Sequence, residues 1–304
     1  MFSPRTDLAL EAAALSVKKP DEKLNGVETD VYTEADITVT KVKIINEEGE
    51  RIIGKTKGNY ITIECPSLRF CDDETAENVR NVFSHELYEI IKPHKHDVIF
   101  VVGLGNRFIT PDSLGPAVSD GIEVSRHLDG GGVSLCAVSP GVLGITGIET
   151  GEIIEGITEK ITPDVIIAID ALASRSMQRI CTTIQIADTG ITPGAGVGNK
   201  RKELSQRTLN IPVIAVGVPT VVDAATVAND SVEHMVSALQ EKMQIDSSLM
   251  DDDNRYTLIK KILSPYFGEL IVTPSEIDSV ISNVASIIAK GINQTGNNLS
   301  QTAI

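Results

Sequence analysis

The sequence predicts an α/β fold, with a mostly parallel central sheet, helices on both faces and additional antiparallel strands. The main observation is a set of Val- and Ile-rich runs bounded by turn residues. They begin at Asp97 (DVIFVVGLG), Val133 (VSLCAVSPG), Asp164 (DVIIAIDAL) and Ile211 (IPVIAVGVPTVVD). Because these runs do not alternate apolar with polar residues, they are typical of strands buried on both faces, as in a parallel sheet covered by helices.

Helical periodicity is the second observation. The segment GPAVSDGIEVSRHL from Gly115 has apolar residues near helical spacing, and SEIDSVISNVASIIAKG near the C-terminus has them more clearly. Three residues predict the start of the second helix: Thr273 as an N-cap hydroxyl, Pro274 at the first helical position, and Glu276, whose carboxylate can bond back to the backbone of the cap residue. We expect this helix to end at Gly291 and the tail beyond it, NQTGNNLSQTAI, to fray.

Two segments show a different pattern. DITVTKVKI from Asp36 and NYITIECPS from Asn59 alternate like half-exposed antiparallel strands. They predict added strands at about residues 36–66 that flank or extend the main sheet. The stretch SSLMDDDNRY from Ser247 predicts a charged surface loop, and we find no internal repeat or low-complexity linker.

Composition limits the possible functions. The chain has 304 residues, is 41% hydrophobic and carries a formal charge of -15. Its length and apolar content are sufficient for a buried core, and its negative charge opposes attraction to a phosphate backbone, so we expect no direct nucleic-acid binding. No run of about eighteen apolar residues occurs, and the N-terminus lacks the apolar core of a secretory signal. We therefore expect a cytoplasmic protein that does not associate with membranes.

Cysteine and histidine spacing predicts neither a disulfide framework nor a metal site. The four cysteines show no CxxC spacing, so buried reduced thiols are expected. His94 and His96 lie two residues apart, but no third ligand follows at usable spacing, and a polar loop before a strand accounts for them. We expect no metal and no cofactor.

The stretch DTGITPGAGVGNKRK from Asp188 fits two catalytic motifs in part. Asp-Thr-Gly is how pepsin-like proteases present a carboxylate, but that fold needs two such loops on a β framework, and this chain has one on an α/β pattern. A phosphate-binding loop needs glycine directly before the lysine, and Asn199 stands there instead. The glycines are equally explained by tight turns at strand ends.

Three aspartates lie where strands of the predicted sheet end. Asp112 follows IFVVGLGNRFITP, Asp170 closes VIIAID, and Asp188 closes TIQIAD. In open α/β sheets, sites form at the carboxyl ends of strands, and two carboxylates held close cannot both ionise, so that one can act as acid and the other as base. Structural alternatives remain open at this point. Asp170 could cap a following helix, ALASRSMQR, and Asp112 could lie near a helix start, where the helix dipole favours any carboxylate.

Five long blocks carry a family resemblance: GLGNRFITPDSLGP, SPGVLGITGIET, PDVIIAIDALASR, IQIADTGITPGAGVGNKRKELS and IPVIAVGVPTVVDA. Together with SPRTDLALEA near the N-terminus, they resemble the germination protease family, the spore endopeptidases of endospore-forming bacteria. The resemblance covers roughly Val101 to Ala224. It implies a fold similar to that of hydrogenase-maturation endopeptidases, and an enzyme of the spore core that cuts small acid-soluble spore proteins during germination.

The resemblance also implies roles for particular residues. Asp112 and Asp170 match the acid pair of the family, which is expected to share a proton and activate water without a metal. Residues 188–202 are expected to shape the substrate groove, and Arg175 either adjusts the charge balance or is an ordinary surface cation. The expected substrate-binding or supporting residues are Asp188, Thr189, Gly190, Gly194, Gly196 and Arg175.

A built-in substrate is implied as well. The family cuts after an acid and before a hydrophobic residue followed by Ala, and Asp7, Leu8 and Ala9 repeat that pattern. The resemblance therefore implies a zymogen that removes residues 1–7 as a propeptide by cleavage between Asp7 and Leu8, leaving a single protease domain over residues 8–304. A homotetramer is also implied.

Two alternatives from other classes stay open. One is a metal-dependent maturation-type endopeptidase that uses the same acids with a third ligand. The other is a non-enzymatic protein on the same fold that binds acidic peptides.

Overall fold

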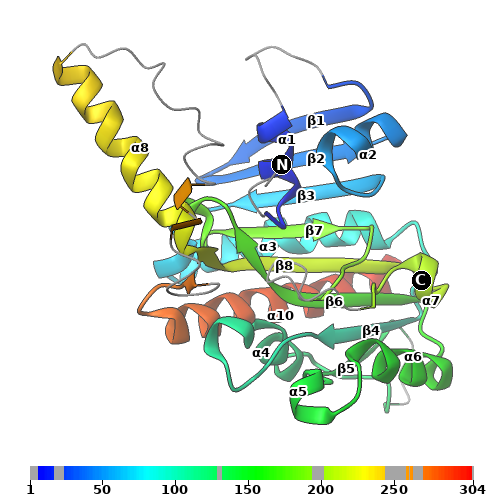
Figure 1. Cartoon of the computed structure of the whole chain (residues 1–304). Helices are drawn as coiled ribbons and strands as arrows, with labels where there is room; N and C mark the ends of the chain where they lie inside the picture. Colours follow the sequence, from blue (N-terminus) through cyan, green and yellow to red (C-terminus); the bar gives the residue numbers. More distant parts are fainter. Residues whose placement is uncertain are drawn as a thin grey trace.

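The computed structural model describes residues 6–16, 24–128, 132–193, 202–243, 258–259, 261–262 and 270–302. Within these ranges one sheet organises the chain, in the order β1-β2-β3-β7-β8-β6-β4-β5, with β9 paired to β8 (Figure 1). Its strands are β1 Val27–Glu34, β2 Ile37–Ile44, β3 Gly58–Glu64, β4 Val98–Gly103, β5 Ser134–Val138, β6 Val165–Ser174, β7 Thr183–Ala187, β8 Val213–Asp223 and β9 Ile271–Val272.

Helices cover both faces of the sheet, as predicted (Figure 1). The α-helices are α1 Ala9–Ser16, α2 Glu47–Ile53, α3 Asp73–Ile91, α4 Leu114–Asp120, α5 Leu143–Thr146, α6 Thr150–Ile161, α7 Gln206–Leu209, α8 Ala224–Met243 and α10 Ile277–Thr302. Short 3-10 helices are η1 Leu68–Phe70, η2 Thr110–Asp112 and η3 Met177–Arg179. None of the described helices is long and apolar enough to cross a membrane.

The α/β class is confirmed, and the expectation of a mostly parallel central sheet with added antiparallel strands was wrong in part. Only β5, β4, β6 and β8 run parallel to their neighbours, in three of the eight described strand pairings. The other five pairings are antiparallel. The cause is β7, which follows β6 after the short segment 175–182. A parallel return needs a crossover of a dozen or more residues, so β7 reverses direction and joins the added strands to β8.

One face of the sheet packs on α3, α4 and α10. Its core includes Phe83 of α3, Val118 of α4 and Ile288 of α10, which pack with Ile169 and Val216 of the sheet. The opposite face is covered in two places. Ala9 and Ala13 of α1 pack with β2, β3 and β7, while Ile154 of α6 packs with β4, β6 and β8.

Two helix boundaries differ from expectation. The helix predicted from Gly115 ends at Asp120 with Gly121 as its C-cap, and the chain that follows is held to β5, where the backbone N–H groups of Ser125 and Arg126 donate to the carbonyl oxygen of Leu135. The C-terminal helix does not end at Gly291 but continues to Thr302. A Cβ atom at Gly291 would lie 2.4 Å from Phe83 Cδ1, so the glycine serves helix packing and not termination. The predicted charged loop from Ser247 lies outside the described residues.

The segment that connects β8 to β9 begins and ends at paired residues of the sheet. Val222 pairs with Val272 and Asp223 with Ile271, and the N–H of Ala224 donates to the carbonyl oxygen of Leu270 at 2.9 Å. Helix α8 extends away from the sheet at this point (Figure 1). The segment 224–270 therefore leaves and rejoins the sheet through adjacent residues.

Candidate active site

Asp170 lies inside strand β6 and not at its end. Its side chain is 7% exposed, and Oδ1 accepts a hydrogen bond of 3.0 Å from the backbone N–H of Ala171. The strand continues to Ser174, so the chain after Asp170 is extended, and the alternative that Asp170 caps a following helix was wrong.

Asp112 closes η2, directly after the loop that follows β4. Its Oδ2 accepts from the backbone N–H of Asn106 at 2.9 Å, and its carbonyl oxygen accepts from the same group at 3.0 Å. The residue lies two positions before α4, so the helix-dipole reading of this carboxylate remains compatible with the structure.

Glycines bring the Asp112 loop onto β6. Gly105 has φ +111°, and a Cβ atom there would lie 2.1 Å from the carbonyl oxygen of Asp112. A Cβ atom on Gly115 would lie 2.1 Å from the carbonyl oxygen of Leu104, whose N–H donates to Ile169 at 2.8 Å. Any side chain at these glycines would push the loop, and Asp112 with it, away from the strand that carries Asp170.

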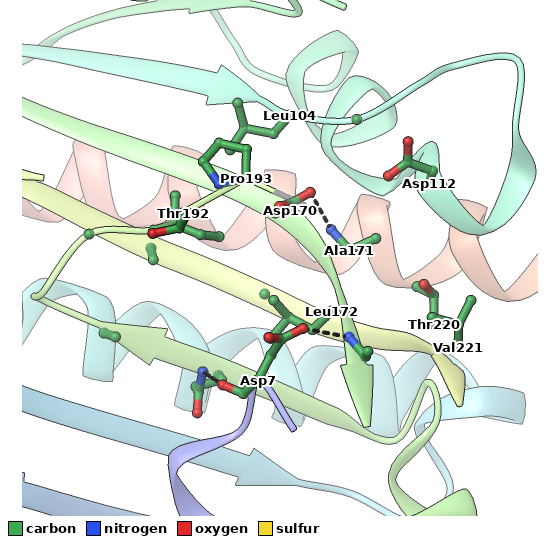
Figure 2. Close-up of a pocket in the computed structure, with 18 of the residues that line it drawn as sticks. Asp7, Leu104, Asp112, Asp170, Ala171, Leu172, Thr192, Pro193, Thr220 and Val221 are labelled. Carbon is green, nitrogen blue, oxygen red and sulfur yellow. Dashed lines mark hydrogen bonds between the residues drawn. The ribbon is translucent and has the colours of Figure 1, made fainter. Parts of the chain in front are cut away.

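Both aspartates line one cavity of about 770 Å³. Its lining includes Tyr60 and Ala187 of the apolar cluster under α1, Leu104 of the cluster under α6, and Ile191, which packs against both. The cavity therefore lies between the two helices that cover this face. Figure 2 shows the carboxyl groups of Asp112 and Asp170 turned toward the same space. The structure thus brings together the two acids that the resemblance singled out.

The cavity floor contains a row of residues across three strands. Asp170 of β6 pairs with Gly217 of β8, which pairs with Gln185 of β7. Paired residues direct their side chains to the same face, so Asp170 and Gln185 face the cavity together, two strand spacings or about 10 Å apart. A Cβ atom at Gly217 would lie 2.4 Å from Leu172 Cδ1, so the absence of a side chain there makes room for Leu172.

The N-terminal segment enters this cavity. The N–H of Asp7 donates to the carbonyl oxygen of Ala173 at 3.1 Å, and the N–H of Ala173 donates to Oδ2 of Asp7 at 2.9 Å (Figure 2). Gln185 Nε2 donates to the carbonyl oxygen of Asp7 at 3.2 Å, and Ala9 N–H donates to Gln185 Oε1 at 2.7 Å. Leu8 is fully buried. The chain on both sides of the Asp7–Leu8 bond is therefore held by β6 and β7.

Glu11 anchors α1 to the chain after β6. Its carboxylate is 4% exposed and accepts from the hydroxyl of Ser174 at 3.0 Å and from the backbone N–H groups of Arg175 at 2.9 Å and Ser176 at 3.1 Å. It also receives the hydroxyl of Thr6 and pairs with the guanidinium of Arg179. These donors offset the desolvation cost of burying the Glu11 carboxylate.

The predicted supporting residues are distributed unevenly. Thr189 and Gly190 line the cavity, whereas Asp188 and Arg175 are not among the described residues that do so. Asp188 instead accepts from the backbone N–H of Asn59 at 2.8 Å and from its side-chain amide at 2.6 Å. Gly194 and Gly196 lie outside the described residues, so their role stays a prediction.

Lys55 lines the cavity together with Asp7. Burial lowers the pKa of its ammonium group below the ordinary value, while the carboxylates of Asp7 and Glu11 act in the opposite direction. Across the described part of the chain, no group of three or more His, Cys, Asp or Glu side chains is placed to hold a metal ion.

Comparisons with known proteins assign the family. The sequence model described as germination protease matches residues 5–249 and 240–302, which include both aspartates and the bound N-terminal segment. The germination protease of Clostridium acetobutylicum is 49% identical, covering 96% of this chain and 95% of the relative. Those of Clostridium tetani and Bacillus cereus AH187 are 46% and 40% identical, with 96% of this chain covered in each case. The chain belongs to the germination protease family.

A solved structure shows a weaker likeness to this germination protease family member. It is a [NiFe] hydrogenase maturation protease, HycI, from Thermococcus kodakarensis KOD1, with 17% sequence identity and a TM-score of 0.36, covering 68% of this chain and 98% of that one. A likeness at this level does not carry residue roles from one chain to the other.

Sequence reasoning missed two residues of the germination protease site. Gln185 is a polar residue in TIQIA, a strand buried at every position, and that contrast was an available signal. Glu11 stands in ALEAAALS, where a single acid in a short helix is indistinguishable from a surface residue. Only the fold, which places Ser174 and Arg179 around it, shows that its carboxylate is buried.

Proposed function

We propose that this germination protease is a zymogen with an aspartic-type acid pair, which cuts small acid-soluble spore proteins during germination and removes its own leader between Asp7 and Leu8. The observation that carries the proposal is the seating of Asp7 and Ala9 on β6 and β7, in the cavity that Asp112 and Asp170 line. The segment with the family's cleavage pattern is held there as an extended peptide, in the manner of a substrate.

The acid pair supplies the chemistry. Asp112 and Asp170 share one proton, and the ionised carboxylate takes a proton from water as the water oxygen bonds to the scissile carbonyl carbon. The C=O electron pair moves onto the carbonyl oxygen. The C–N bond then breaks, and the protonated carboxyl gives its proton to the departing nitrogen. In leader removal, the products are a new carboxyl group on Asp7 and a free amine on Leu8.

Contacts around the leader support the substrate class. The carboxylate of Asp7 is received by the N–H of Ala173, with the ammonium of Lys55 nearby, so the position before the cut favours an acid. Leu8 is fully buried, which favours a hydrophobic residue after the cut. Small acid-soluble spore proteins with an acid followed by a hydrophobic residue and Ala would present the same groups.

Mass spectrometry of the full chain incubated with a small acid-soluble spore protein tests the proposal. We expect the unaltered chain to cut after an acid and to lose residues 1–7. Asp112→Asn and Asp170→Asn should each slow both reactions by about 100- to 10,000-fold. Asp120→Asn is the matched control, because that carboxylate is 61% exposed in a surface pair with Arg107. Equal rates for Asp170→Asn and the control would refute the acid pair.

The same experiment separates the alternatives. Loss of activity with a chelator and its return with nickel or zinc would favour the metal-dependent enzyme, and lasting binding of uncut substrate would favour the peptide-binding protein. We further propose a homotetramer located in the spore core cytoplasm, with no nucleic-acid or membrane partner. Light scattering coupled to size exclusion would measure the number of subunits.

A further inference from the structure

Gln185 makes a two-sided contact with the main chain around the Asp7–Leu8 bond. Its Nε2 donates to the carbonyl oxygen of Asp7 at 3.2 Å, and its Oε1 accepts from the N–H of Ala9 at 2.7 Å. We propose that Gln185 is a catalytic residue of this protease, whose side-chain amide binds the scissile carbonyl oxygen and stabilises the negative charge that develops there. This inference rests on the proposed cleavage between Asp7 and Leu8.

The orientation of the Gln185 amide is fixed by its partners. A carbonyl oxygen can only accept and a backbone N–H can only donate, so the nitrogen of Gln185 must face Asp7 and the oxygen must face Ala9. The side chain is 8% exposed and projects from β7 into the cavity. A buried amide with both ends engaged is held in one position before the reaction begins, which is the requirement for an oxyanion donor.

Gln185 also lies in the same row as one of the two acids. Asp170, Gly217 and Gln185 are paired across β6, β8 and β7, so the amide and the carboxyl face the cavity from two strands with Gly217 between them. A peptide bonded to Gln185 thus lies on the sheet face that carries Asp170. The acid pair would deliver water to the carbonyl carbon while the amide receives charge at the carbonyl oxygen.

Both hydrogen bonds of Gln185 go to main-chain atoms of the bound segment, whereas specificity depends on the contacts of the side chains of Asp7 and Leu8. When water adds to the carbonyl carbon, the C=O electron pair moves onto the oxygen and the hydrogen bond from Nε2 strengthens. The bond to the N–H two residues later keeps the chain in register. Gln185 therefore acts on any substrate, whatever residues flank the cut.

Gln185→Glu tests the donor role, because it keeps an oxygen for Ala9 but replaces the donor by a carboxylate at neutral pH. We expect the first-order rate of leader removal, followed by intact mass of the full chain, to fall about 100- to 1,000-fold relative to the unaltered chain at pH 7. As the pH falls and the new carboxyl group protonates, its O–H can again donate to the carbonyl oxygen. The ratio to the unaltered rate should then rise toward one.

Two further variants complete the experiment. Gln178→Glu makes the same chemical change at an exposed position and should process at the unaltered rate. Gln185→Met keeps length and volume but has no donor, so it should be slow at every pH. A Gln185→Glu chain that processes at the unaltered rate at pH 7, or that stays folded and slow with no recovery at low pH, would overturn the role of Gln185. If the unaltered chain fails to remove its leader, the proposed function falls, and this inference falls with it.

Discussion

The guanidinium Nη1 of Arg179 lies 3.2 Å from the buried Oε1 of Glu11, and its Nε lies 2.9 Å from Oε1 of Glu64. One cation thus joins α1, which carries Glu11, to β3, which carries Glu64. Because the bound segment of Asp7 directly precedes α1, this ion pair holds the start of the chain on the sheet beside the cavity.

Glu11→Ala should destabilise the fold strongly. The change removes the acceptor of the Arg175 N–H, leaves the Ser174 hydroxyl and the Ser176 N–H with only their bonds to each other's residue, and leaves Arg179 with Glu64 alone. We expect the free energy of unfolding in urea to fall by about 3 kcal/mol. The control Glu77→Ala removes a carboxylate that is 61% exposed and pairs with Arg80 on the surface, and it should change the free energy of unfolding by less than about 0.5 kcal/mol. Similar losses for the two variants would contradict the anchoring role.

Gly115→Ala should displace the Asp112 loop. The added methyl group would meet the carbonyl oxygen of Leu104 at 2.1 Å, so backbone must shift, at a cost of about 1–3 kcal/mol and with loss of activity. Gly156→Ala is a matched control within α6, where nothing lies within 4 Å of the new Cβ, and it should raise stability by up to about 1 kcal/mol. Thermal unfolding of both variants measures the contrast, and a stable, active Gly115→Ala chain would be incompatible with this packing.

Lys55 should make stability depend on pH. Its folded pKa is lowered, so between that value and its ordinary value of 10.5 the unfolded chain binds more protons, and stability rises with pH. Lys55→Met removes this dependence. The unfolding free energy of Lys55→Met minus that of the unaltered chain should therefore fall as the pH rises from 7 toward 10. Lys57→Met makes the same change at an exposed position and is the matched control. A difference for Lys55→Met that does not change with pH would contradict the lowered pKa.

Cys181 should resist alkylation in the folded protein. It is fully buried, and burial raises the pKa of its thiol to about 11, so almost no thiolate is present at pH 8. Cys71 and Cys136 are partly exposed and should react before it. Peptide mapping after iodoacetamide treatment at pH 8, with and without urea, identifies the modified residues. Rapid modification of Cys181 without urea would show that this part of the core opens.

Much of the sheet could be predicted from the sequence because buried parallel strands consist of apolar runs. The runs at Val98, Val165 and Val213 became β4, β6 and β8, and the alternating segments became β2 and β3. β1 could not be found in this way, since VETDVYTE is exposed at most positions on the edge of the sheet. The direction of β7 was equally hidden, because it depends on which strand it pairs with and not on its own composition.

The candidate site was predictable only in part. Asp112 and Asp170 stood out as acids next to apolar runs, and the structure places both on one cavity. Asp188 stood out for the same reason, yet its carboxylate is bonded to Asn59. Strand ends are common positions for both kinds of carboxylate, and only the register of β6, β8 and β7 distinguishes the face that carries Gln185 and Asp170.

The segment 224–270 has a consequence for how the chain can vary in length. It departs from β8 and returns to β9 through a neck closed by the bond between Ala224 and Leu270, so no other strand's register depends on how many residues lie between them. The two stretches matched by the family model, 5–249 and 240–302, overlap inside it. For a flexible loop, loop-closure entropy costs only about 0.6 kcal/mol for each doubling of length. An insertion should therefore be placed away from the neck itself, because Ile271, which pairs with Asp223 there, also lines the cavity.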